Sequence, residues 1–220
     1  RELRGSLRIS SLDIVFELWR ADLLELQQQL PRVELVLLDQ THVVDLARRE
    51  ADVAIRFAIA PPEHLVGRRH VELFYAVYAS AQLVERVTDG GARTARYADY
   101  PWIGWDGMFA AATDRVVQQH APGAAIPLRI NSLALLGRSI EDGIGVSVMP
   151  CFYGDRQPGL VRLGDYFEGG MYFWVLTHEQ LRRTARVRAF TDFVARLIER
   201  DRPLFLGRSP AAPTVAVATS

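Results

Sequence analysis

The feature of this sequence that most constrains its fold is the alternation of short apolar runs with segments of helical periodicity. Residues 7–10 alternate as a short strand does, and residues 12–30 place apolar side chains three and four positions apart, on one helical face. Residues 33–38 form an apolar, leucine-rich run typical of a buried parallel strand. A short helix over 41–49 and a third strand over 52–57 continue the pattern. Strands that alternate with helices predict an α/β fold with a mostly parallel sheet.

The second half of the chain repeats this pattern after a break at Ala60-Pro61-Pro62. Thr177 with Gln180 fits a capping box, which predicts the start of the last helix. The apolar positions of that helix, Val187, Phe190, Val194 and Leu197, follow helical spacing. The other predicted elements are strands at 71–79, 102–103, 128–130, 146–149 and 171–176, and helices at 109–120 and 132–142.

This order of elements predicts two lobes in one chain. The last helix follows the second lobe and is expected to return to the first, so the chain crosses twice, near 74–78 and 171–175. A two-crossing hinge with a cleft between lobes is an architecture that binds small molecules. The predicted boundaries are 1–76 with 171–206 for lobe I, 77–170 for lobe II, and 207–220 for a disordered, Pro- and Ala-rich tail.

Charge argues against direct binding of nucleic acid by this chain. Its 26 basic residues, all arginine, balance 26 acidic ones, whereas a DNA-binding domain usually carries a clustered positive excess. The basic run Arg182, Arg183, Arg186 and Arg188 is interpreted as a solvated helix face. No apolar stretch approaches the length of a transmembrane helix, and the first residues do not resemble a signal peptide.

Several short segments, taken in order, resemble the regulatory domain of LysR-type transcriptional regulators. The resemblance runs over roughly residues 3–200, and the order and spacing of the segments carry it more than any one of them does. The segments are Gly5-Ser6-Leu7-Arg8-Ile9-Ser10, Leu30-Pro31-Arg32-Val33-Glu34-Leu35, Asp45-Leu46, Ala51-Asp52-Val53-Ala54-Ile55-Arg56, Leu65-Val66-Gly67-Arg68, Tyr75-Ala76-Val77-Tyr78-Ala79-Ser80, Asn131-Ser132, Asp142-Gly143-Ile144-Gly145-Val146 and Met149-Pro150.

The resemblance implies a two-lobed type 2 periplasmic-binding-protein fold, with mostly parallel sheets flanked by helices around an effector cleft. It also implies a homodimer, tetrameric in the full-length regulator, whose regulatory domains pair antiparallel with the first long helix, residues 12–30, at the interface. DNA would be contacted only through a winged helix-turn-helix preceding this domain. We therefore expect a cytoplasmic ligand sensor that is not an enzyme, uses no cofactor and does not bind a membrane.

The candidate effector site lies at the carboxyl ends of the predicted strands, where ligands bind in open α/β sheets. Ser11 and Ser132 would begin helices and offer backbone N–H groups to a carboxylate, Arg56 could clamp the same group, and Trp105 could stack on a ring. Each has a structural alternative: helix caps for the serines, a surface ion pair for Arg56, and core packing for Trp105. The full predicted set is Ser10, Ser11, Leu12, Gln40, Thr41, Arg56, Phe57, Trp105, Asn131, Ser132 and Ile144.

Other chemistries find little support in the sequence. The five histidines are scattered without metal-ligand spacing, so no metal site and no catalytic residues are predicted. The single cysteine, Cys151, is interpreted as a structural, partly buried thiol. The alternative function is a transporter's extracytoplasmic solute-binding protein, which shares this fold but would carry a signal peptide upstream. An enzyme on the same fold would need a positioned acid–base pair in the cleft.

Overall fold

The chain folds into two compact units, and each unit is built from separated stretches of sequence. The structure is a computed structural model that describes residues 3–39, 51–62, 65–209 and 213–218. Unit 1 comprises Arg1–Glu72 and Gly170–Arg202, and unit 2 comprises Leu73–Gly169 and Pro203–Ser220. The chain thus passes from one unit to the other after residues 72, 169 and 202. The sequence pattern predicts the first two of these crossings after residues 76 and 170.

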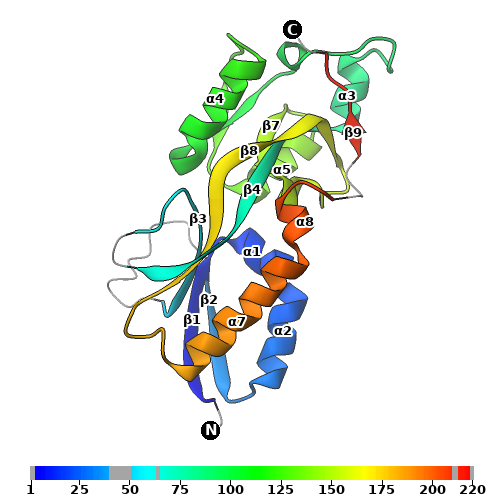
Figure 1. The fold of residues 1–220 in the computed structure, drawn as a ribbon. Helices are drawn as coiled ribbons and strands as arrows, with labels where there is room; N and C mark the ends of the chain where they lie inside the picture. Colours follow the sequence, from blue (N-terminus) through cyan, green and yellow to red (C-terminus); the bar gives the residue numbers. More distant parts are fainter. Residues whose placement is uncertain (1–2, 40–50, 63–64, 210–212, 219–220) are drawn as a thin grey trace. The chain divides into compact units, whose positions relative to one another are not determined.

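Unit 1 is a sheet whose strands come from both ends of the chain (Figure 1). Strand β1 lies between β2 and β3 and is parallel to both, and the end of β8 is antiparallel to β3. The predicted first helix is present as two consecutive helices that are divided at Trp19, while the helix predicted at 41–49 lies outside the described residues. The elements are β1 (Gly5–Ser11), α1 (Asp13–Leu18), α2 (Arg20–Gln29), β2 (Val33–Asp39), β3 (Val53–Ala58), the start of β4 (Val66–Ser80), the end of β8 (Leu160–Thr177) and α7 (Ala185–Arg200).

The core of unit 1 is centred on three aromatic rings. The ring of Phe173 on β8 lies 5.5 Å from that of Trp19 and 5.2 Å from that of Phe57. The indole N–H of Trp19 donates to a carboxylate oxygen of Asp201 at 2.9 Å, so its one polar group is satisfied. Helix α7 buries Val187, Phe190, Val194 and Leu197, which confirms the apolar face predicted from their spacing.

Unit 2 contains the second set of strands and helices. Strands β5 and β6 are parallel, β4 pairs antiparallel with β7, and the strand order of the larger sheet is β2-β1-β3-β8-β4-β7. The elements are the rest of β4 and β8, α3 (Ala81–Val87), β5 (Ile103–Trp105), α4 (Ala110–His120), β6 (Leu128–Ile130), α5 (Leu133–Glu141), β7 (Ser147–Pro150), α6 (Cys151–Gly154), α8 (Arg202–Phe205), two 3₁₀ turns (Tyr97–Asp99 and Gly107–Phe109) and β9 (Thr214–Val215).

Two local predictions were wrong. The Thr177–Gln180 capping box does not form: Thr177 is the last residue of β8, its hydroxyl donates to the backbone oxygen of Asp52 at 2.7 Å, and α7 begins only at Ala185. Within the tail expected to be disordered, the described residues Thr214 and Val215 instead form β9, which pairs in parallel with β8. In both cases a hydrogen bond between residues far apart in the sequence determines the structure, and the local sequence pattern does not predict it. No helix in the described ranges is long and apolar enough to cross a bilayer.

Candidate functional site

Two of the predicted residues, Ser10 and Arg56, are hydrogen-bonded to each other near the carboxyl ends of β1 and β3 in unit 1. The guanidinium of Arg56 on β3 donates through Nη1 to the backbone oxygens of Ser10, at 2.9 Å, and Ile55, at 2.8 Å. Its Nη2 donates to the hydroxyl of Ser10 at 3.1 Å. Ser10 and Ser11 are both buried at the end of β1. The fold therefore holds one cation against Ser10 and Ile55 by hydrogen bonds to neutral oxygens.

The environment of Arg56 leaves its charge without a carboxylate. Burial lowers the pKa of Arg56 to about 10, and the guanidinium remains charged at neutral pH. Within the described part of the chain, no Asp or Glu side chain lies within ion-pair distance of it, so the predicted alternative of a surface ion pair is not found there. A partly buried cation of this kind is a binding group for an anion.

The next residue of β1, Ser11, has a buried side chain. The Oγ of Ser11 is buried and has no hydrogen-bond partner among the described residues, which typically costs about 1–3 kcal/mol. Ser11 was expected to cap the first helix, but the N-cap position belongs to Leu12, which makes no side-chain cap. Instead, a carboxylate oxygen of Asp13 accepts from the backbone N–H of Ile14 at 2.7 Å. The Ser11 side chain therefore does not cap the helix, and its hydroxyl stays without a partner among the described residues.

The remaining candidates have other placements. Phe57 is buried in the core of unit 1 against Phe173, and Leu12 is half-buried. In unit 2, Trp105 is buried, donates from Nε1 to the backbone oxygen of Val148 at 2.7 Å, and packs edge-on against Phe109. This favours the core-packing alternative for Trp105.

The other predicted residues of unit 2 lie at its surface. Ser132 caps α5, because its hydroxyl accepts from the backbone N–H of Leu135 at 3.3 Å. Its predicted N-cap role is therefore confirmed. Asn131 and Ile144 are exposed, while Gln40 and Thr41 lie outside the described residues. No group of three or more metal-ligating side chains occurs in the parts of the chain that the structure describes.

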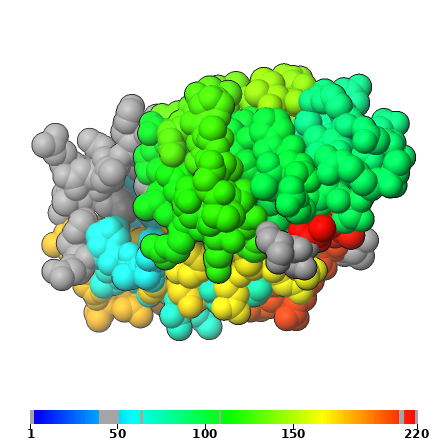
Figure 2. Space-filling model, turned by 90° about the horizontal axis from the view of Figure 1, so that it is seen from above, coloured from blue at the N-terminus to red at the C-terminus, as the bar shows by residue number. Residues whose placement is uncertain are grey.

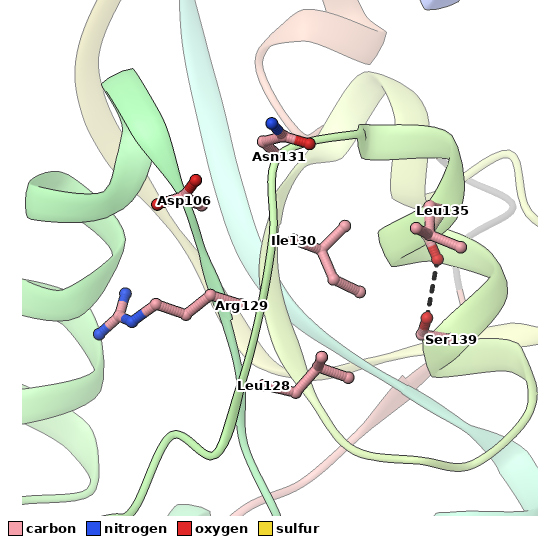
Figure 3. Close-up of a pocket in the computed structure, with 7 residues that line it drawn as sticks. All are labelled: Asp106, Leu128, Arg129, Ile130, Asn131, Leu135 and Ser139. Atoms are coloured by element: carbon pink, nitrogen blue, oxygen red, sulfur yellow. Dashed lines mark hydrogen bonds between the residues drawn. The ribbon is translucent and has the colours of Figure 1, made fainter.

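Unit 2 also has a groove that the sequence did not indicate. Figure 3 shows Leu128 and Ile130 of β6 turned toward Leu135 and Ser139 of α5, around a cavity of about 440 Å³. Arg129 points to the other side, where it pairs with Asp114 of α4 at 2.9 Å. Leu135 is 57% exposed although it is apolar, so this face is not covered within its own unit. The remaining lining residues are Asp106, Arg129 and Asn131.

Comparisons with known proteins define the class of this chain. The fold matches regulatory domains that share the type 2 periplasmic-binding-protein fold, which confirms the predicted α/β class. The regulatory domain of CrgA from Neisseria meningitidis is 17% identical, with a TM-score of 0.71, over 89% of this chain and 99% of that one. The effector domain of AmpR from Pseudomonas aeruginosa is 19% identical, with a TM-score of 0.72, over 94% and 99%.

A third solved structure has the same fold, and the sequence itself identifies the family. The regulatory domain of CcmR from Synechocystis PCC6803, solved in complex with 2-PG, is 17% identical, with a TM-score of 0.64, over 88% of this chain and 97% of that one. Residues 1–198 match the family model of the LysR substrate binding domain. The chain therefore belongs to this family of transcriptional-regulator domains. A search of curated protein sequences finds no match.

Proposed function

We propose that this chain is the sensor of a LysR-type transcription factor and that its effector is a small anion, such as a carboxylate, bound at the carboxyl ends of β1 and β3. The observation that supports this most is the charge of Arg56. It is partly buried, and its hydrogen-bond partners are backbone and hydroxyl oxygens. A carboxylate or phosphate oxygen placed there would supply the negative charge that these partners lack.

Ser11, which follows Ser10 on β1, is a further candidate. The buried Ser11 hydroxyl could donate to an anion oxygen, and it has no partner within the described residues. The cation alone specifies the charged group, and the rest of the effector stays unspecified. A domain of similar fold, that of CcmR, was solved in complex with 2-PG, which supports a ligand-sensing role for this fold. Participation of the other predicted residues, including Asn131, Ser132 and Ile144, stays a prediction.

The test is a thermal-shift screen of organic acids on three proteins: the wild type, Arg56→Ala, and Arg188→Ala as the control. Arg188 is exposed on α7 in the same unit, so its removal changes net charge equally away from the site. An acid at 100 times its Kd should stabilise the wild type by about 2.7 kcal/mol, roughly 5–11 °C in Tm. The Arg188→Ala protein should respond in the same way, and Arg56→Ala should lose most of the shift. Equal stabilisation of all three proteins would refute the site.

We further propose that the chain forms a homodimer through two apolar surfaces. On unit 1, Leu24 of α2 is 60% exposed and Leu37 of the edge strand β2 is 43% exposed. On unit 2, the groove between β6 and α5 presents Leu128 and Leu135. A second copy is the favoured occupant because a two-fold arrangement would let each copy supply both surfaces, and the family resemblance places the first helix at such an interface.

Oligomeric state tests the dimer. Leu24→Glu and Leu135→Glu each place a charge on a proposed surface, and each should shift the protein toward the monomer in light-scattering measurements. Ala112→Glu, on the exposed face of α4, is the matched control and should leave the dimer intact. A wild type that remains monomeric at high concentration would contradict the proposal, and so would dimers unaffected by both leucine substitutions.

The alternative functions make different predictions. A solute-binding protein of a transporter would be preceded by a signal peptide, whereas a regulator would be preceded by a DNA-binding helix-turn-helix. The family match to a transcriptional-regulator domain favours the second. We infer that the chain acts in the cytoplasm, is not an enzyme, and leaves sequence-specific reading of DNA to a preceding domain. The upstream residues of the gene decide between the two.

A further inference from the structure

The chain continues beyond the family match, and this continuation packs on unit 2. The match ends at residue 198, while residues 203–220 belong to unit 2. Phe205 of α8 is fully buried, with its ring 5.3 Å from that of Phe152. Gly207 follows with a φ of +67°, and a Cβ there would lie 3.1 Å from the sulfur of Cys151. The first part of the tail is therefore an anchor fixed in the core of unit 2.

Arg162 on β8 connects this anchor to the rest of unit 2. Its guanidinium pairs with Asp155 at 2.5 Å and donates to the backbone oxygen of Gly207 at 3.2 Å. Asp155 also accepts from the hydroxyl of Tyr78 at 2.6 Å. The Arg162 and Asp155 side chains are 7% and 0% exposed, so this is a buried ion pair. Such pairs define one arrangement of the segments that supply them.

The outer part of the tail adds a strand to β8. The backbone N–H of Arg162 donates to the oxygen of Pro213 at 2.8 Å, and Thr214 and Val215 pair in parallel with Arg162 and Leu163. Ala218 donates to the backbone oxygen of Ala95 at 2.9 Å. In Figure 2, the red atoms of the tail lie against the other residues of unit 2. This edge of β8 would otherwise present unpaired backbone groups.

The two parts of the tail are held by different forces. Phe205 and Gly207 are buried, whereas Pro213, Thr214 and Ala216 are exposed. The outer strand therefore depends mainly on backbone hydrogen bonds and buries little apolar surface. A short segment attached in this way opens more easily than the core beneath it.

We propose that the edge of β8 at Arg162 and Leu163, together with Ala95, is a strand-docking groove, and that its occupant is the chain's own segment 213–218, held reversibly. The groove accepts an extended segment that runs parallel to β8 and brings a backbone oxygen to the Arg162 amide. The groove residues lie within the family match, whereas the segment that fills the groove lies beyond it. The proposal does not depend on the proposed effector site or dimer.

Complementation in trans tests the groove. A chain ending at Ser209 keeps the anchor and lacks the outer strand, and a synthetic peptide of residues 208–220 is added to it. We expect the peptide to shift the amide resonances of Arg162 and Leu163. Its Kd should be lower than the roughly millimolar effective concentration of the tethered segment, because the groove of the intact chain is occupied. The intact chain should not respond, since its groove is occupied. A folded truncated chain that ignores the peptide, or an intact chain that binds it equally, would overturn the proposal.

A second measurement uses the full-length chain and covers the case in which the truncated chain does not fold. Val215→Pro prevents regular pairing at β9, and Ala216→Pro is the control at an exposed position next to it. The Arg162 amide should exchange with solvent at least about tenfold faster in Val215→Pro and at nearly the wild-type rate in Ala216→Pro. An unchanged rate in Val215→Pro would contradict the groove. A rate that falls as protein concentration rises would instead assign the docked tail to a second copy.

Discussion

Replacing Arg162 by methionine should destabilise unit 2 strongly. The substitution keeps much of the side-chain volume but leaves the Asp155 carboxylate buried without its cation, although the Tyr78 hydroxyl still donates to it. Removing one partner of a buried ion pair typically costs about 3–5 kcal/mol. For a chain of this length, that corresponds to a fall in Tm of about 6–20 °C.

The matched control is Arg138→Met on α5. Arg138 pairs with Glu141 at 3.1 Å, but its side chain is 80% exposed. Exposed pairs contribute about 0–1 kcal/mol, so Tm should fall by no more than roughly 4 °C. Thermal unfolding followed by tryptophan fluorescence and circular dichroism measures both variants.

A double variant separates loss of the ion pair from general damage. Replacing both partners, Asp155→Leu with Arg162→Met, removes the unpaired buried charge and should recover part of the stability lost in Arg162→Met. Equal melting temperatures for Arg162→Met and Arg138→Met would refute the argument. So would a double variant less stable than Arg162→Met alone.

Three further predictions concern single residues. Burial raises the pKa of Cys151 to about 12, so the folded protein should resist alkylation at neutral pH. The stability due to the neutral thiol is complete below about pH 8.5 and declines as the pH rises toward 12. Cys151→Ala should reduce this alkaline loss of stability, measured by urea unfolding at several pH values. Ser132→Ala removes the hydroxyl that accepts from the Leu135 amide and should cost about 0.5–2 kcal/mol, measurable by urea unfolding and absent if the cap is not formed. Gly67→Ala places a Cβ against the backbone oxygen of Val175 and should cost about 1–3 kcal/mol, whereas an unchanged Tm would show that the strands can separate there.

Periodicity was sufficient to predict most of the fold, because alternating burial and helical spacing are local properties of the sequence. The apolar face of α7 and the strands around β1 were predicted in this way. Helix α3 was missed, although Ser80 followed by Leu83 and Val84 gives a cap and an apolar face. The first half of β8 was missed because glycines interrupt its pattern.

Features that depend on long-range contacts could not be predicted. The pairing of Thr214 with Arg162 joins residues that no local pattern relates, and nothing in the sequence indicates the buried Arg162–Asp155 pair. At the candidate site, the strand-end rule drew attention to Arg56, but only the structure shows that its hydrogen-bond partners among the described residues are neutral. The Ser11 cap was wrong because the helix begins one residue later than the sequence suggested.

The most direct test of the sensor is a crystal structure of the domain with an acid that stabilises it. An acid oxygen should lie about 2.7–3.2 Å from the guanidinium of Arg56. An acid bound elsewhere, with Arg56 still bonded only to Ser10 and Ile55, would contradict the proposed role of this cation.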